Sequence, residues 1–260
     1  HPTNRRQRQM CIRDRYEGDE TFTLSGASSS QTGTVSGEAT IQDGGEGNDN
    51  DRPDLTVTGA GTVSEGEVAT FSINLSNPVD HAVTLDLRAK TNGNANTAEA
   101  DDIGEMRAYY LDGDAKVYLD FDGREISVPA GVQDIFVEVD TVDDNAAPVH
   151  EGSERFQLVV RDVDGVTTDN NGKAKAAAFI DDSGNGAGDN PDDDRPDITS
   201  ISSLTVDEGG TAVFDVTLSN PSELATPVTM TLANGTAEND DYTSNQLTVN
   251  FADGTSTVVD

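Results

Sequence analysis

Carboxylates are the functional groups that this chain holds in greatest number. Its 260 residues include 49 Asp and Glu against 16 Lys and Arg, a formal net charge of −33 at pH 7. Carboxylate oxygens suit Ca²⁺, which takes about six to eight oxygen ligands at roughly 2.3–2.6 Å. Paired carboxylates also serve glycosidases, but acidic pairs occur along the whole chain and spacing singles out none of them. The residue types therefore favour cation binding.

Other reaction chemistries lack their residue patterns. The histidines are His1, His81 and His150, and Glu154 stands where a His-Glu-x-x-His zinc motif beginning at His150 would need its second histidine. The sequence contains no Gly-x-Ser-x-Gly turn of serine hydrolases. We expect a protein that is not an enzyme.

Charge and composition exclude further classes. Nucleic acid is not an expected partner, because phosphate binding requires a basic surface. No apolar run approaches the roughly 18–20 residues of a membrane span, and no signal peptide is recognisable, so any export signal is expected outside this chain. Cys11 is the only cysteine, which rules out a disulfide within the chain. A charge of this size opposes compaction, so a folded chain needs cations near its carboxylates.

Short β-strands are the elements that must position these carboxylates. An alternation of apolar and polar residues is typical of half-buried strands. Five segments show it: 71–75, 83–87, 117–121, 135–139 and 156–160. Turn signals such as Ser76-Asn77-Pro78 and Asp122-Gly123 separate these segments, and no segment holds a helical period. The pattern predicts an all-β antiparallel sandwich, whose end loops can bring several carboxylates together.

Internal repeats are the strongest feature of the sequence. Three motifs recur at one constant spacing: Asp51-Arg52-Pro53-Asp54 as Asp194-Arg195-Pro196-Asp197, Glu65-Gly66 as Glu208-Gly209, and Ser76-Asn77-Pro78 as Ser219-Asn220-Pro221. From the other end of the unit, residues 17–22 match 151–156 and residues 39–43 match 178–182. The repeats predict three units.

The predicted units are one complete repeat and two partial ones. Residues 16–50 are the C-terminal part of a first repeat, 51–190 a complete repeat with an acidic linker, and 191–260 the N-terminal part of a third. On this division we expect the chain to be cut within a repeat at both ends. Residues 1–15 are basic, show no strand pattern and resemble a translated sequencing adapter, so we expect an artefact there. A genuine basic tail is the alternative.

The order of these motifs resembles the Calx-beta repeat. The complete repeat has Thr-Val-Ser-Glu65-Gly66 and then Leu75-Ser76-Asn77-Pro78. The third unit matches most closely, with Thr205-Val206-Asp207-Glu208-Gly209 and the stretch from Gly235 to Thr243, which is similar to the family's Gly-Thr-Ala…Asp-Tyr signature. The complete repeat departs from the family between Asp102 and Pro129, where it carries extra residues.

The resemblance implies tandem immunoglobulin-like β-sandwiches that bind calcium. Such repeats bind regulatory calcium in animal sodium–calcium exchangers. In bacteria they form arrays in secreted proteins and in large surface adhesins of the calcium-dependent RTX type. The acidic composition resembles that of the bacterial arrays, which implies an extracellular or cell-surface location.

The resemblance also implies a set of calcium ligands. In the complete repeat they are Glu65, Asp102, Asp143, Asp144, Glu151, Asp181 and Asp182, and in the third unit Glu208 and Asp241. Carboxylates gathered within about 4–6 Å raise one another's pKa unless a cation is present. The alternative is a solvated acidic surface without bound metal. Linker 181–197 contains seven Asp, so it is either a flexible connection or one stiffened by calcium between domains.

We expect a calcium-binding structural or adhesion module of a large secreted or cell-surface protein. Its expected partners are calcium and a cell-surface glycan or protein target. The alternative is an accessory or carbohydrate-binding module of an extracellular hydrolase, in which calcium would bridge sugar hydroxyls.

Overall fold

The chain is all-β over the part that the structure describes. The computed structural model describes residues 15–30, 32–43, 50–92, 96–144, 146–168, 171–189, 191–238, 240–243, 247–251 and 257–259. The predicted all-β class is confirmed over these ranges. Almost all of the adapter-like segment 1–15 lies outside them. Among the described residues no helix is long and apolar enough to cross a membrane.

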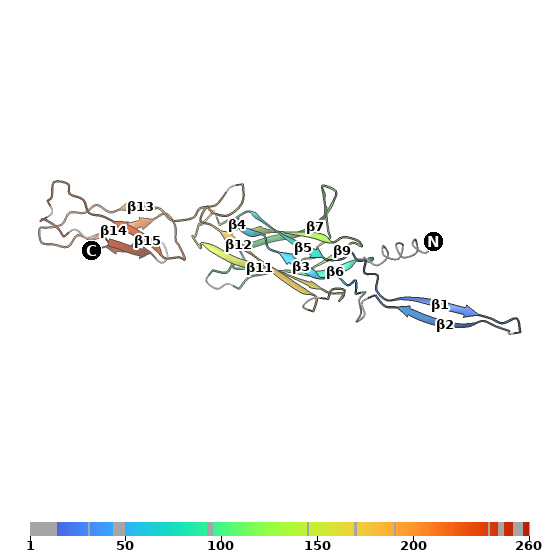
Figure 1. Cartoon of the computed structure of the whole chain (residues 1–260). Helices are drawn as coiled ribbons and strands as arrows, with labels where there is room; N and C mark the ends of the chain where they lie inside the picture. The colour runs from blue at the N-terminus through green and yellow to red at the C-terminus, as the bar shows by residue number, and fades with distance from the viewer. Residues whose placement is uncertain are drawn as a thin grey trace, which may run out of the picture.

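Three bodies lie in a row along the molecule (Figure 1). At one end is a hairpin of β1 (Glu20–Gly26) and β2 (Val35–Ile41). The central body spans residues 55–181. At the other end is a third body made by the strands after residue 197.

The central body consists of two five-stranded sheets. The first has the order β3 (Leu55–Thr58), β5 (Val68–Leu75), β10 (Asp134–Thr141), β7 (Ile103–Asp112) and β8 (Ala115–Tyr118). The second has the order β4 (Gly61–Ser64), β12 (Lys173–Asp181), β11 (Ser153–Asp162), β6 (Val83–Lys90) and β9 (Glu125–Val128). Neighbouring strands run antiparallel except β12 and β4, which are parallel.

One apolar core joins the two sheets. Alternate side chains of each strand point inward, as the period of two requires. Phe71 of β5 and Phe156 of β11, both 0% exposed, meet across the core edge to face, with ring centroids 5.6 Å apart. This arrangement is a two-layer β-sandwich.

Strand prediction failed in one place. The predicted strands at 71–75, 83–87, 135–139 and 156–160 lie within β5, β6, β10 and β11. The predicted strand 117–121 was wrong over its second half, because β8 ends at Tyr118. There the backbone N–H of Leu119 donates to Ala108 O (2.9 Å) and the chain turns toward β9 in the other sheet. An alternating pattern does not reveal where a strand changes sheet.

The repeated Asp-Arg-Pro-Asp and Ser-Asn-Pro motifs meet in space. In the central body the N–H of Asp54 donates to Ser76 Oγ (2.8 Å), and the N–H of Ser76 returns a bond to Asp54 O (3.0 Å). Asn77 Nδ2 donates to Asp51 O (3.1 Å). These bonds fix the entry of β3 against the end of β5.

The third body repeats these bonds. The N–H of Asp197 donates to Ser219 Oγ (2.9 Å), and that of Ser219 donates to Asp197 O (2.8 Å). Asn220 Nδ2 donates to Asp194 O (2.6 Å). The strands of this body are β13 (Ile198–Ile201), β14 (Phe214–Leu218), β15 (Thr226–Met230), β16 (Leu247–Phe251) and β17 (Thr257–Val259). The recurrence of the sequence motifs therefore reflects a shared backbone geometry.

We expect Phe156→Ala to lower the free energy of unfolding of the sandwich by roughly 3–5 kcal/mol, because it opens a cavity in the core. Phe179→Ala is the matched control on the paired strand β12, where the ring is 38% exposed, and should cost about 1 kcal/mol or less. Urea unfolding followed by far-UV circular dichroism measures both. Equal losses would contradict the inter-sheet role of Phe156.

Candidate metal centre

Carboxylates converge at the end of the sandwich that leads to the third body. They come from the turn after β4, the β6–β7 and β10–β11 connections, the start of β11 and the chain after β12. We call the following residues the acid cluster: Glu65, Glu99, Asp102, Asp143, Asp144, Glu151, Glu154, Asp182, Asp192 and Asp194.

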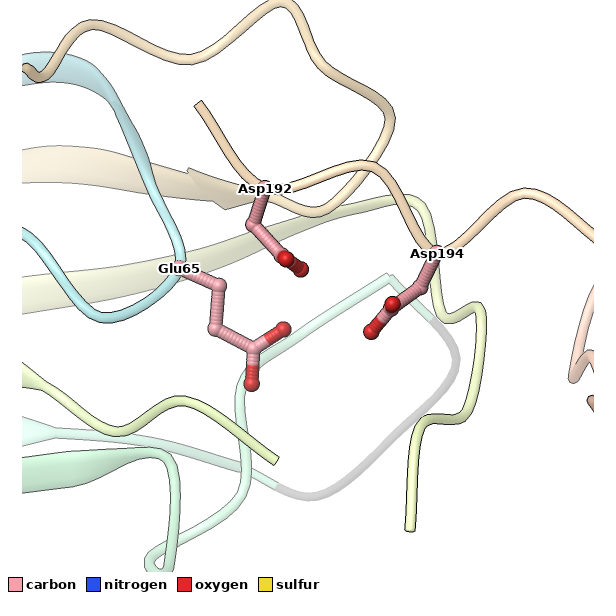
Figure 2. A group of neighbouring side chains, drawn as sticks. All are labelled: Glu65, Asp192 and Asp194. Carbon is pink, nitrogen blue, oxygen red and sulfur yellow. The ribbon is translucent and has the colours of Figure 1, made fainter. Parts of the chain in front are cut away.

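One group within the cluster joins the β4 turn to the linker. Carboxylate oxygens of Glu65, Asp192 and Asp194 all lie within 4.8 Å of one another, and their side chains point into a common space (Figure 2). The N–H of Asp192 donates to Ser64 Oγ (2.7 Å), and the N–H of Asp194 donates to Asp182 O (2.7 Å). These bonds hold the linker against the sandwich.

Glycines allow this close approach of the linker. Ala187 exchanges backbone bonds with β4, donating to Thr62 O (3.1 Å) and accepting from Ser64 N (2.9 Å). A Cβ at Gly186 would collide with the backbone of Ser64, and one at Gly188 with the side chain of Glu67. The glycines of this segment therefore serve packing, in addition to any freedom that they give the chain.

A second group lies on β11 and the β6–β7 connection. Glu99, Asp102 and Glu154 bring carboxylate oxygens within 4.8 Å of one another. The N–H of Glu99 donates to Asp102 Oδ2 (2.5 Å), which fixes one member. Glu154 is only 7% exposed, because it occupies an inward position of β11 beside Phe156.

A small cavity lies between the two groups. Its volume is about 10 Å³, close to the space that one water-sized species needs. Its lining includes members of both groups and consists of Glu65, Asp102, Glu151, Gly152, Glu154, Ile180 and Asp182.

Burial and mutual repulsion raise the pKa values of several acids in the cluster. Burial raises the pKa of Glu65 to about 8, with further contributions from Asp144, Asp182 and other carboxylates. The pKa of Glu154 is raised to about 8 by burial first and then by Glu151 and other acids. The negative charge of the cluster is therefore poorly compensated by the protein itself.

Burial and neighbouring charge also raise the pKa values of Glu151 and Asp194. Burial, followed by the charges of Asp102 and Glu223, raises the pKa of Glu151 to about 7. Burial and the contact with Asp144 raise that of Asp194 to about 7. Glu223 belongs to the third body, so charge from that body reaches the cluster.

Three buried carboxylate oxygens have no hydrogen-bond partner within the part of the chain that the structure describes. They are Asp144 Oδ1, Asp192 Oδ2 and Asp194 Oδ2. Buried polar atoms are normally paired, and an ion is one of the partners that such atoms take. The residues present therefore fit a hard cation with oxygen ligands.

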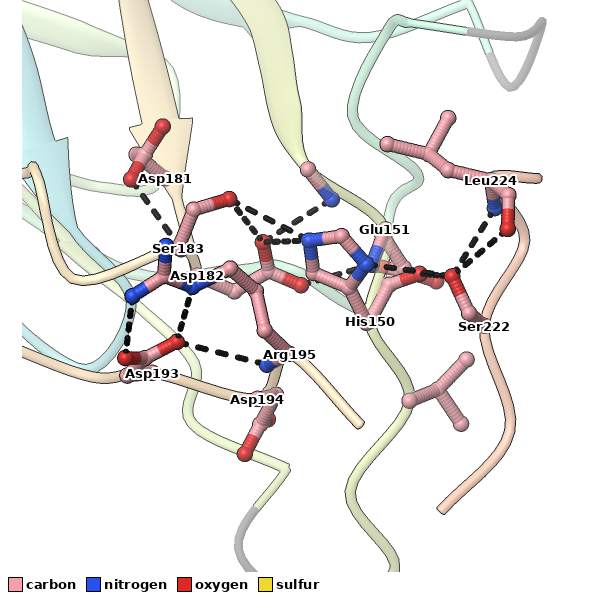
Figure 3. Close-up of polar contacts among 12 residues, drawn as sticks. His150, Glu151, Asp181, Asp182, Ser183, Asp193, Asp194, Arg195, Ser222 and Leu224 are labelled. Carbon is pink, nitrogen blue, oxygen red and sulfur yellow. Dashed lines mark hydrogen bonds and ion pairs between the residues drawn. The ribbon is translucent and has the colours of Figure 1, made fainter. Parts of the chain in front are cut away.

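Asp182 both lines the cavity and braces it. Its two oxygens accept the N–H groups of Glu151 (2.6 Å) and Gly152 (2.8 Å) (Figure 3). His150 lies at the rim, with Nε2 3.8 Å from Asp182 Oδ1 and Nδ1 3.0 Å from Ser222 Oγ of the third body. The bonds to Asp182 therefore hold in place residues 150–152, the loop that contacts the third body.

The structure brings most of the expected ligands together. Six of them lie in the acid cluster: Glu65, Asp102, Asp143, Asp144, Glu151 and Asp182. Asp181 points elsewhere, since its Oδ1 accepts from the backbone N–H groups of Ser183 (3.1 Å) and Asn185 (3.2 Å).

The two expected ligands of the third body are exposed, and neither is a member of the acid cluster. Glu208 follows the segment equivalent to β4. Asp241 Oδ2 accepts from Glu238 N (2.8 Å), the bond that Asp102 makes with Glu99.

Sequence reasoning missed Glu99, Glu154, Asp192 and Asp194 as cluster members. Glu154 carried a usable signal, because it alternates with the apolar Phe156 on β11 and must point inward. The two linker aspartates belong to the Asp-rich segment for which stiffening by calcium was one expectation, but the sequence does not show that this segment folds back onto β4.

Comparisons with known proteins assign this chain to no family. No family model and no curated protein matches the sequence. Among solved structures, Escherichia coli alpha-2-macroglobulin activated by porcine elastase is similar at 13% sequence identity and a TM-score of 0.27. The match covers 95% of this chain but 27% of that chain, so this chain spans about a quarter of its length. A likeness this weak bears on neither fold nor function.

Proposed function

We propose that this chain is a calcium-binding structural module, built from immunoglobulin-like repeats of the Calx-beta type, in a large secreted or cell-surface protein. The observation that carries the proposal is the acid cluster, with its raised pKa values and its unpartnered buried oxygens. Ca²⁺ suits it because Ca²⁺ accepts many oxygen ligands in irregular directions, whereas Mg²⁺ demands a near-octahedral set.

A spacer role draws support from the joints between bodies. At the first joint the N–H of Tyr16 donates to Pro78 O (3.0 Å), and the N–H of Asp80 donates to Tyr16 O (3.0 Å). Tyr16 precedes Glu17-Gly18, and Pro78 belongs to the Ser-Asn-Pro turn of the following unit.

The second joint has the same pair of bonds. The N–H of His150 donates to Pro221 O (3.0 Å), and the N–H of Glu223 donates to His150 O (2.9 Å). His150 precedes Glu151-Gly152, as Tyr16 precedes its own Glu-Gly pair. A joint that recurs in one geometry sets each unit at a similar angle to the next, as an extended spacer requires.

A bound cation would strengthen the second joint. Glu223 contributes negative charge to Glu99 and Glu151 across the boundary between the bodies. A cation in the cluster would turn this repulsion into attraction. The proposed role of calcium is therefore to stiffen the sandwich end, the linker and the joint together.

Calcium should raise the melting temperature of the full chain well above its value in chelator, and more than equal magnesium does. A cation that binds only the folded state at 100 times its Kd adds about 2.7 kcal/mol. Glu65→Gln should lose most of this rise, yet melt above wild type in chelator at neutral pH, because Gln is neutral without the proton that folding of wild type must bind at this buried carboxyl. Far-UV circular dichroism is the readout, as the chain has no Trp.

The matched control is Glu105→Gln on β7, where the side chain is 75% exposed and outside the cluster. It should keep the calcium response of wild type. Equal melting of wild type in calcium and in chelator would refute the metal site.

In chelator we expect stability to fall as pH rises from about 4.5 to about 8. Glu65 and Glu154 have a pKa of about 8 in the folded chain and an ordinary value of 4.5 when unfolded. The folded state thus binds more protons over this window, and linkage makes stability decrease with pH. In calcium the trend should weaken or reverse, because the metal binds the deprotonated form. Melting temperatures measured across this window in both buffers test it, and a flat profile in chelator would contradict it.

Small-angle X-ray scattering tests the spacer part. The scattering curves are extrapolated to zero protein concentration. In calcium we expect the dimensions of the extended row of bodies, and in chelator we expect a broader distribution of distances within the molecule. Glu223→Gln should reduce the difference between buffers, because it removes the third body's charge from the joint. Glu238→Gln, exposed elsewhere on the third body, should leave it unchanged. Identical distributions in both buffers would exclude stiffening by calcium.

A further inference from the structure

Strand β7 of the central sandwich is covered along only part of one edge. It has ten residues, and β10 pairs with it on one side from Ile103 to Tyr109. On the other side β8 has four residues and reaches back only as far as Tyr109. Among the residues that the structure describes, no strand pairs with residues 103–107 on that side. This part of β7 is therefore an open sheet edge in the middle of the complete unit.

A cleft with a volume of about 670 Å³ runs along this open edge. All five residues of the edge line it, and most of the remaining lining comes from segment 118–121, where the chain leaves β8 for β9. The volume lies within the roughly 300–1,000 Å³ that is usual for ligand sites. An edge recessed in a cleft favours a single extended peptide over the flat edge of another folded sheet.

The backbone of β7 offers hydrogen-bonding groups to the cleft. The N–H of Leu119 donates to Ala108 O (2.9 Å), so the polar backbone groups of Ala108 point toward the β8 side. In a strand every second residue points its N–H and C=O to the same side. The β-bulge between β7 and β10 lies beyond Met106, so the alternation is regular from Ala108 to Met106. Met106 therefore presents its N–H and C=O to the cleft.

The position beside Met106 is one that a longer β8 would occupy. Tyr109 lies opposite Tyr118, so an unbroken β8 would place Phe121 opposite Met106. Phe121 instead forms a bridge to Ile126 of β9 and packs against the core. The place beside Met106 in the first sheet is therefore filled by no strand of the described chain.

The inner side of the cleft is apolar. Met106, Leu119 and Phe121 line it, and all three are partly buried against the core of the sandwich. A side chain that entered the cleft opposite Met106 would meet these groups, because residues opposite each other in a sheet point to the same face. This position therefore selects an apolar residue.

The outer side of the cleft carries uncompensated negative charge. Glu105 and Asp120 line it, and both are exposed. Arg107 is the cation of the lining, but its guanidinium already bonds both oxygens of Asp140 (2.8 and 2.6 Å). It lies 3.7 Å from Glu105 Oε2, a longer contact. A residue that pairs with this side is therefore best basic.

We propose that this cleft binds an extended peptide segment of a partner protein, which adds antiparallel to β7 and continues the line of β8. The backbone of the segment bonds Met106, and its side chains alternate between apolar residues facing inward and basic residues facing Glu105. In strand addition main-chain hydrogen bonds supply affinity and alternate side chains supply specificity. Neither Met106 nor Glu105 belongs to the acid cluster, so this activity goes beyond the proposed binding of calcium.

Fluorescence anisotropy of a labelled octapeptide of alternating Lys and Val, titrated with the full chain, tests the proposal. We expect saturable binding at physiological salt, where a Debye length of about 8 Å limits unspecific attraction by the net charge of −33. The titration is run in calcium and in chelator. Peptide binding does not require a calcium-dependent rise in melting temperature, so either proposal can fail without the other.

Two methylated peptides separate strand addition from charge attraction. The residue opposite Met106 is a Val, whose N–H donates to the edge of β7. N-methylation of the Val residues should weaken binding about tenfold or more, because it removes these donors. N-methylation of the Lys residues keeps the same charge and leaves these donors in place, so this peptide should bind like the parent.

Variants of the chain test the same bonds from the other side. Met106→Pro removes the N–H at the open edge and should abolish binding, while the fold survives because an edge strand tolerates proline there. Met106→Ala keeps the N–H and should still bind. Glu105→Gln should weaken binding of the Lys peptide, but not of a peptide with Thr in place of Lys. Circular dichroism checks the fold of each variant.

Three results would overturn the proposal. The two methylated peptides could bind equally, in which case charge alone accounts for the affinity. Folded Met106→Pro could bind as well as Met106→Ala, which would exclude backbone pairing at Met106. The parent peptide could fail to bind in both buffers, whether or not a neutral sugar such as maltotriose binds in its place.

Discussion

Repulsion among the carboxylates at one end of the sandwich is the constraint on which the rest of the structure depends. The apolar core holds the strands together, and the strands hold the acidic loops at short range. Burial gives those charges a low local dielectric, which strengthens their repulsion. The same arrangement that costs stability without a cation would become a ligand set for one under the proposed function. Core packing and ion affinity are therefore parts of one energetic balance.

The linker and the following body also contribute to the repulsion among these carboxylates. Asp192 and Asp194 reach the cluster because Gly186 and Gly188 let the backbone lie directly on β4. Glu223 then adds charge from the following body. The acid cluster is therefore assembled from the sandwich and its exit segment, neither of which holds all the carboxylates alone, and charge from the following body acts on it.

Much of the fold was predictable from the sequence because its physics is local. Alternation located β5, β6, β10 and β11, since a buried face leaves a period of two in the residues. It failed after Tyr118, where the chain passes between sheets. In the candidate site, motif-based expectation found most acids of the loops, although not Glu99 in the β6–β7 connection. It missed Glu154, which sits in a strand, and the linker aspartates, whose position depends on a long-range return of the chain.

The parallel pairing of β4 with β12 has a mechanical consequence. The two strands lie near the entry and the exit of the sandwich, and Gly61–Ser64 run alongside residues 178–181. Tension applied through the flanking chain would pull them in opposite directions along their length. Their hydrogen bonds would then be loaded together in shear, and could not open one after another like a zipper. A tether made of such units would resist extension best along the axis in which its bodies are already aligned.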